Sequence, residues 1–270
     1  MQTITSPQAP KYTELAKNHG KFEILGCYPG YGTTLGNALR RVVLSSLAGA
    51  AARSVKIKGV SHEFSTIEGV MEDVVQIILN LKQVRFKLLG DEDEVVKVTL
   101  KSKGEGVVTA GSIKTTSNVE IVNPDQVIAT VTDKKTELEM EIEVDRGLGY
   151  VPVESRDRDD EREIGVIAID AIYTPVKRVN YEVENMRVGK RTDYDKITLE
   201  IVTDGSVSPV EAFEKSVSIL VGQFASLTAV AADEEVVAEG TTATEEVEPA
   251  AEEKKTKKVS KKKKTEEAAE

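Results

Sequence analysis

Apolar side chains recur at the spacing of an amphipathic helix in three stretches of the chain. The stretches are residues 32–49 (GTTLGNALRRVVLSSLAG), 65–82 (STIEGVMEDVVQIILNLK) and 208–227 (SPVEAFEKSVSILVGQFASL). At about 100° per residue, one face of the first stretch collects Leu35, Ala38, Leu39, Val42, Val43 and Ser46. The pattern therefore predicts three helices, each with one face against the rest of the protein.

Residues that commonly begin helices stand at the start of each stretch. They are Thr33 or Thr34 in the first, Ser65 with Glu68 in the second, and Ser208 with Pro209 and Glu211 in the third. The two Ser–Glu pairs have the spacing of a capping box, in which each side chain bonds the backbone N–H of the other residue. We therefore expect the helices to begin at these residues and the first to end at Gly49.

Other stretches alternate apolar and polar residues as strands do. Residues 138–144 (LEMEIEV) and 196–202 (KITLEIV) alternate without a break, and the second is followed by a turn signal at Asp204-Gly205. Residues 53–60 and 94–100 are further predicted strands. Because there is no regular strand–helix–strand rhythm and no internal repeat, the predicted fold class is α+β.

The outward face of the first predicted helix carries two adjacent arginines and a leucine, Arg40, Arg41 and Leu44. In one interpretation the arginines are solvated and Leu44 is an ordinary exposed apolar residue. In the other, Arg41 and Leu44 form a patch for a protein partner, because arginine bonds carboxylates and carbonyls while its stem covers apolar surface. The pattern alone leaves both interpretations open.

The third predicted helix has a continuous apolar seam with 3-4-3-4-3 spacing. The seam consists of Val210, Phe213, Val217, Leu220, Phe224 and Leu227. Such a seam suits a facing helix from a second copy of the chain. A helix lying on its own sheet produces nearly the same pattern, so both alternatives stand.

Composition indicates a soluble cytosolic protein. The 270 residues include a single cysteine, Cys27, and no apolar run approaches the roughly 20 residues of a membrane span. The net charge of −10 argues against non-specific nucleic-acid binding by the whole surface. Residues 231–270 are rich in charge and poor in bulky apolar residues, so they are predicted to be a disordered low-complexity tail.

Signals for catalysis are sparse. No nucleophile pairs recognisably with His19 or His62, and neither a phosphate-binding loop nor a zinc-like Cys/His cluster is present. The acidic stretch 154–163 contains Asp159 and Asp160, but its interleaved arginines would repel a metal cation. We therefore expect no catalytic, cofactor or metal site, with an enzyme that uses His62 and this acidic stretch as the alternative.

Several motifs together resemble the N-terminal domain of the bacterial RNA polymerase alpha subunit family. They are GYGTTLGNALRRVVLSSLAGAA, SHEFSTIEGVMEDVVQIILNLK, VDRGLGYVPV, the stretch 164–212 and the final helix, in that order over roughly residues 20–227. The resemblance implies a discontinuous dimerisation subdomain of residues 1–50 and 175–230. A mostly β subdomain of residues 51–174 is inserted into it.

The resemblance also implies a function in assembly. It predicts a homodimer that binds the polymerase subunits beta and beta-prime, with omega and sigma in the same complex and DNA reached mainly through that complex. This chain would be cytoplasmic, would bind no cofactor and would carry no catalytic residue, and magnesium is expected in the catalytic subunit. The alternatives are the enzyme above and a heterodimeric scaffold, as in archaeal and eukaryotic relatives. The family's small C-terminal domain, which binds promoter DNA, is expected to be missing.

The resemblance assigns contact residues by position in the motifs. For beta these are Arg41, Leu44, Glu68, Glu72 and Asp73, and for beta-prime Lys196 and Ile169. For the dimer interface they are Leu35, Leu39, Val210, Phe213, Val217, Leu220, Phe224 and Leu227. In this interpretation, the seam of the third helix is a dimer face.

Overall fold

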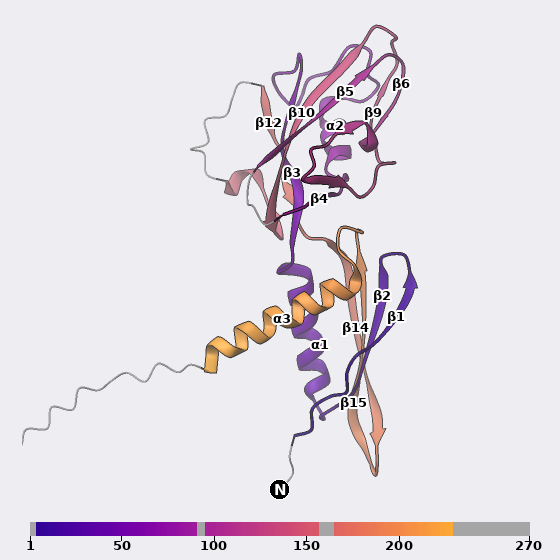
Figure 1. Ribbon diagram of the computed structural model, residues 1–270, viewed down its shortest axis with the longest axis vertical. Coiled ribbons are helices and arrows are strands. Elements are labelled where there is room, and N and C mark those ends of the chain that lie inside the picture. The colour runs from indigo at the N-terminus through magenta and orange to yellow at the C-terminus, as the bar shows by residue number, and fades with distance from the viewer. Residues whose placement is uncertain (1–3, 91–94, 157–164, 229–270) are drawn as a thin grey trace, which may run out of the picture. The chain divides into compact units, whose positions relative to one another are not determined.

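The computed structural model describes residues 4–90, 95–156 and 165–228, and its mixture of helices and strands confirms the α+β class (Figure 1). The tail predicted at 231–270 lies outside the described residues. Of the clusters of buried apolar side chains, the two large ones organise the described part. One contains residues from both ends of that part, and the other contains residues between them.

The first cluster lies between a four-stranded sheet and two helices, and we call it the α1–α3 core. The antiparallel sheet has the order β1-β2-β15-β14, and the helices are α1 and α3. Their bounds are β1 Lys11–Ala16, β2 His19–Cys27, α1 Tyr31–Ser45, β14 Val176–Val188, β15 Arg191–Thr203 and α3 Pro209–Thr228. The core consists of Phe22, Ile24, Cys27, Leu39, Val43, Leu47, Val176, Val179, Ile197, Leu199, Ile201, Ala212 and Phe213.

The second cluster is built on a larger sheet and one short helix, and we call it the α2 core. This antiparallel sheet has the order β7-β5-β10-β3-β4-β8, with β12 also paired to β3. The bounds are β3 Ala48–Ile57, α2 Val74–Leu81, β4 Phe86–Leu88, β5 Val96–Lys103, β7 Ile113–Lys114, β8 Val119–Ile121, β10 Glu137–Leu148 and β12 Val166–Ala168. Two further ribbons are separate two-stranded sheets, which pair β6 Gly106–Thr109 with β9 Val127–Val131 and β11 Tyr150–Val151 with β13 Ala171–Ile172. Short 3-10 turns cover Ala110–Ser112 and Val153–Ser155.

The strands predicted from alternation are confirmed. In β10 the side chains of Leu138, Met140, Ile142 and Val144 are all buried in the α2 core. In β15, Ile197, Leu199 and Ile201 are fully buried in the α1–α3 core. Each strand hides its apolar face because alternate side chains point to opposite sides of a sheet.

Helix α1 begins earlier than predicted and without a side-chain cap of its own. Its N-cap is Gly30, in a left-handed conformation at φ +84°, so the prediction of Thr33 or Thr34 is wrong. The helix ends at Ser45, and Gly49 lies in β3 rather than terminating the helix. A side chain at Gly49 would collide with the carbonyl oxygen of Tyr173. This glycine therefore permits close approach of two backbone segments.

Helix α2 is much shorter than predicted, because the chain before it pairs with β9. Val70 forms a bridge with Val131, and the Met71 N–H donates to the Thr130 carbonyl at 2.9 Å. A backbone already paired in this way cannot continue a helix toward Ser65. The helix begins at Val74, and its cap is Asp73, whose Oδ1 accepts the Gln76 N–H at 2.7 Å.

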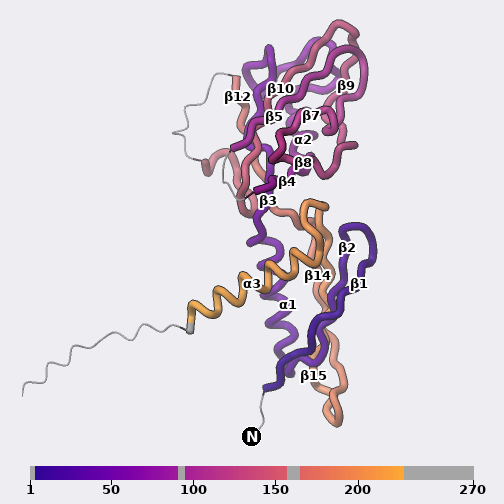
Figure 2. Tube along the Cα trace, in the orientation of Figure 1, coloured from indigo at the N-terminus to yellow at the C-terminus, as the bar shows by residue number. Residues whose placement is uncertain are grey.

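Helix α3 agrees with the prediction. The Ser208 hydroxyl accepts the Glu211 N–H, and the Glu211 carboxylate accepts the Ser208 N–H, each at 3.2 Å. Pro209 occupies the first helical position, where a missing N–H costs nothing. The helix crosses α1, and its C-terminal half runs beyond it (Figure 2).

Candidate protein-interaction surfaces

Helix α3 divides into a buried half and an exposed half. Near its start, Phe213 is only 7% exposed and stacks on Phe22 with ring centroids 4.5 Å apart. Near its end, Val221 and Phe224 are each 62% exposed and Leu227 is 73% exposed. We call Val221, Phe224 and Leu227 together the α3 ridge. Large apolar side chains gathered in this way mark an interaction surface.

The predicted dimer residues therefore fall into different environments. Phe213 and Leu39 belong to the α1–α3 core, so the chain's own fold covers most of both side chains. Four more are half-buried and pack against the same core, namely Leu35, Val210, Val217 and Leu220. Phe224 and Leu227 are the predicted dimer residues that stand free of it.

On helix α1 the two arginines and Leu44 differ in exposure. Arg40 and Arg41 are exposed, as predicted. Leu44 is half-buried against the α1–α3 core, and its carbonyl accepts the Thr174 hydroxyl at 3.3 Å. The Arg41 side chain is thus presented to solvent beside a leucine that is only partly covered.

The predicted acidic contacts before α2 have structural partners of their own. The Glu72 carboxylate accepts both the N–H and the hydroxyl of Thr130, at 2.6 and 2.9 Å. Asp73 caps α2, whereas Glu68 is exposed. Glu68 and Asp73 are therefore both solvent-facing, and Asp73 also caps the helix, whereas Glu72 is half-buried.

An exposed apolar row on and before α2 was missed from the sequence. Met71, Val75 and Leu79 are exposed at i, i+4 spacing, and Phe64 is exposed just upstream. The opposite side of this helix, with Val74, Ile77 and Leu81, is fully buried. The sequence contained a signal for this row, because the predicted helix is apolar on both of its sides. Such a helix has more apolar surface than one core can cover.

The two residues predicted to contact beta-prime lie in opposite environments. Lys196 is on the sheet surface, where its Nζ lies 3.0 Å from a Glu184 oxygen and 3.7 Å from a Glu23 oxygen. The hydrogen bond and charge of Glu184, with a smaller contribution from Glu23, raise the pKa of Lys196. Ile169 is 2% exposed within the α2 core, so its side chain is covered by the chain's own fold.

The region between β2 and α1 is held by an aspartate from a distant strand. Asp195 of β15 is 7% exposed, and its Oδ2 accepts the N–H groups of Gly30 and Gly32, each at 2.9 Å. This carboxylate fixes the beginning of the helix that carries Arg41. Sequence spacing gave no sign of it, because the bonded residues are more than 160 positions apart.

Within the described ranges, no three histidine, cysteine, aspartate or glutamate side chains are grouped so as to hold a metal ion. His62 is exposed, with its Nδ1 at 3.1 Å from the Ser65 hydroxyl. Asp159 and Asp160 of the alternative enzyme site lie outside the described residues. None of the helices in the described ranges is both long enough and apolar enough to cross a membrane.

Comparison with known proteins gives consistent matches over most of the chain. Residues 55–174 match the family model described as the RNA polymerase Rpb3/RpoA insert domain. The chain is 50% identical over 228 residues to a protein of Moorella thermoacetica, covering 83% of this chain and 72% of that one. It is 51% identical over 221 residues to one of Roseiflexus castenholzii, covering 82% and 67%.

A protein of Geobacter metallireducens is 54% identical over 206 residues, covering 76% of this chain and 59% of its own. All three relatives are named DNA-directed RNA polymerase subunit alpha. The matched insert domain contains the α2 core apart from Ala52, while the longer matches reach beyond it into the helices and strands of the α1–α3 core. The chain therefore belongs to the family of DNA-directed RNA polymerase alpha subunits.

Proposed function

We propose that this chain acts as a homodimeric assembly subunit, which joins two copies through the α3 ridge and then binds the beta and beta-prime subunits. RNA synthesis from ribonucleoside triphosphates is the activity of the completed complex, which includes omega and sigma and works in the bacterial cytosol. Magnesium for that chemistry is held by a large subunit. The observation that carries the proposal is the α3 ridge, Val221, Phe224 and Leu227, exposed at the end of a helix whose first half is buried.

A second copy is the occupant that best fits this ridge. The seam of α3 continues from the chain's own core into the exposed half with unchanged 3–4 spacing, which suits an antiparallel helix pair around a two-fold axis. Each residue of such an interface is used twice, so a modest ridge can hold two copies together.

Sedimentation velocity tests the homodimer. Phe224→Asp replaces an apolar ridge side chain with a charged one, and each dimer would contain two such substitutions. Because burying one phenylalanine contributes ~1.5–3 kcal/mol, we expect self-association to weaken by at least about 100-fold. The matched control is Ser226→Asp, which adds the same charge to an exposed position on the opposite side of the helix. A Phe224→Asp chain that sediments as the wild type would refute this dimer.

Arg41 is the residue we propose for recruiting beta. It is exposed on α1, whose beginning is fixed by Asp195, so its position is well defined. Arg41→Ala should abolish retention of beta by tagged chain while leaving the dimer intact. Arg40→Ala, which removes the neighbouring exposed arginine, is the control and should retain beta. Equal retention by the two variants would contradict the assignment.

A further inference from the structure

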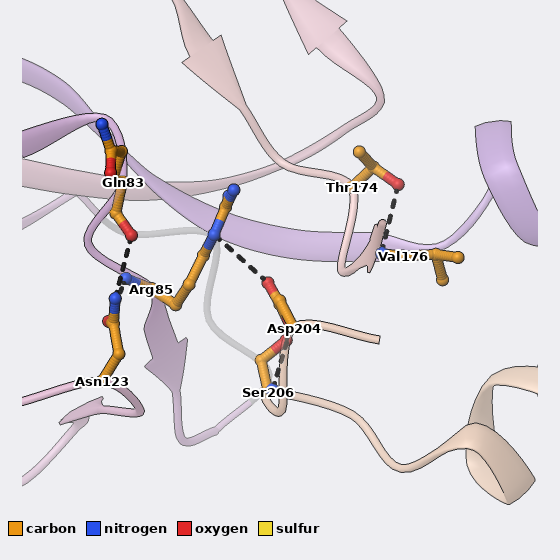
Figure 3. A network of polar contacts seen from close by, with 7 residues as sticks. All are labelled: Gln83, Arg85, Asn123, Thr174, Val176, Asp204 and Ser206. Carbon is orange, nitrogen blue, oxygen red and sulfur yellow. Dashed lines mark hydrogen bonds and ion pairs between the residues drawn. The ribbon is translucent and has the colours of Figure 1, made fainter. Parts of the chain in front are cut away.

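The α1–α3 core and the α2 core are linked by an ion pair between side chains. Arg85, between α2 and β4, places its Nε 3.7 Å from Oδ2 of Asp204, in the turn between β15 and α3 (Figure 3). The Asp204 side chain is 5% exposed and that of Arg85 22% exposed. Water therefore screens this pair much less than it screens a pair on the open surface.

The Asp204 end of the pair is held rigidly by its own turn. Oδ1 accepts both the N–H of Ser206 at 2.9 Å and its hydroxyl at 2.6 Å (Figure 3). The Asp204 backbone N–H donates to the Pro175 carbonyl at 2.9 Å. One carboxylate oxygen thus shapes the turn, and the other is directed to Arg85.

The Arg85 end is fixed by the α2 core. The Arg85 N–H donates to Oδ1 of Asn123 at 2.7 Å, and its carbonyl accepts the Val122 N–H at 2.9 Å. Asn123 in turn donates from Nδ2 to the Gln83 carbonyl at 3.0 Å. The Asp204 carboxylate and the Arg85 backbone are therefore each held by other contacts, so the Arg85 side chain is the part that loses conformational freedom when the pair forms.

Close packing accompanies the ion pair on one side and open space on the other. Gly205 has φ +101°, and a Cβ there would lie 2.7 Å from the Asn18 side-chain nitrogen and 3.0 Å from Val122. Beside it lies an open groove of about 650 Å³, lined by residues near both cores that include Lys17, Lys87 and Asp204. Because the groove is open, apolar side chains do not pack the two cores together on this side, and the contact between them there is the polar Arg85–Asp204 pair.

We propose that Arg85 and Asp204 are positioning residues that hold the two cores in one relative orientation. The consequence for assembly rests on the proposed function. Arg41 is exposed on α1, which packs in the α1–α3 core, whereas Glu68 and the row Met71, Val75 and Leu79 lie on or just before α2. A large subunit that contacts both parts binds more tightly when their geometry is preset, because less orientational freedom is lost on binding.

Distance measurement between spin labels tests the orientation directly. Labels at Thr13→Cys on β1 and Val107→Cys on β6, both exposed, report on the two cores in a Cys27→Ala background. Labelled chain is diluted into unlabelled chain, so that a dimer contains one labelled copy. We expect a narrow distance distribution that broadens with Arg85→Gln or with Asp204→Asn.

Asp204→Asn keeps the side-chain oxygen that shapes the turn and removes only the charge. Combining it with Arg85→Gln should broaden the distribution no further than either change alone, since each already breaks the same pair. Lys87→Gln is the control, because it removes an exposed positive charge beside the same groove. A distribution for Arg85→Gln as narrow as that for Lys87→Gln overturns the proposal.

Retention of beta by the same variants separates this inference from the proposed function. We expect Arg85→Gln and Asp204→Asn to weaken beta binding by about tenfold to similar extents, with self-association unchanged. If wild-type chain binds no beta, the proposed function fails, and the distances still decide the positioning role. If the distances broaden while beta affinity stays at the wild-type value, the link between orientation and assembly is overturned.

Discussion

The beginning of helix α1 depends on a carboxylate supplied by strand β15, and removing it should destabilise the protein measurably. Gly30, the N-cap, has no side chain to accept the first N–H groups of the helix. Asp195 accepts two of them, from Gly30 and Gly32, and is 7% exposed. Its negative charge also lies at the positive end of the helix dipole.

The expected cost follows from these contacts. Loss of an N-cap costs ~1 kcal/mol, and each buried N–H left unsatisfied costs ~1–3 kcal/mol. Because the two costs overlap at one site, Asp195→Ala should lower the free energy of unfolding by about 3 kcal/mol. Asp195→Asn keeps an accepting oxygen and loses mainly the interaction of charge with dipole, so we expect about 1 kcal/mol.

Urea unfolding followed by circular dichroism measures both variants, at one fixed protein concentration because association adds to apparent stability. The matched control is Asp193→Asn, two residues away on the same strand. Asp193 is 52% exposed and bonds Arg191, so its loss should cost less than about 0.5 kcal/mol. If Asp195→Ala unfolds at the same urea concentration as Asp193→Asn, the carboxylate does not cap the helix energetically.

Two further predictions concern polar groups on β10 and near it. Hydrogen bonds from Lys101 and Lys58 lower the pKa of Glu139 from 4.5 to about 2. The interactions of ionised Glu139 with the two lysines therefore stabilise the fold above the unfolded pKa of 4.5, and this stabilisation is lost as pH falls through about 2. Glu139→Gln removes the carboxylate, so the free energy of unfolding should depend less on pH below 4.5. An NMR titration that places the Glu139 midpoint near 4.5 would contradict the effect. The Tyr173 hydroxyl donates to Asp145 at 2.7 Å, so Tyr173→Phe should cost ~1–3 kcal/mol in urea unfolding, and an unchanged midpoint would exclude a stabilising bond.

Sequence alone predicted those elements whose determinants lie within a few residues of one another. The capping box of α3 needs only Ser208 and Glu211, and the burial of β10 follows from alternation over residues 138–144. The family resemblance also came from contiguous motifs, which the matching of residues 55–174 to the insert domain supports. Local signals of this kind survive folding because the tertiary structure reinforces them.

Features set by distant residues could not be predicted in this way. Helix α1 is capped from β15, and the start of α2 is moved to Val74 by pairing of Val70 with β9. The exposure of a seam residue depends on what the tertiary fold places beside it. Ile169 illustrates the same limit, since its position in a family motif does not reveal that its side chain fills the α2 core.

The seam of α3 shows why periodicity identifies an apolar face but not the surface that covers it. Phe213 and Phe224 are eleven residues apart on nearly the same side of the helix, yet the first stacks on Phe22 and the second faces solvent. The second half of α3 runs beyond α1 (Figure 2), so there the same row of side chains is exposed to solvent unless a second chain covers it. A second α3 laid along the ridge would extend the α1–α3 core from one chain into the next. Dimerisation would then be the continuation of folding along a single helix, and a substitution at Phe224 would weaken association without disturbing the core that holds Phe213.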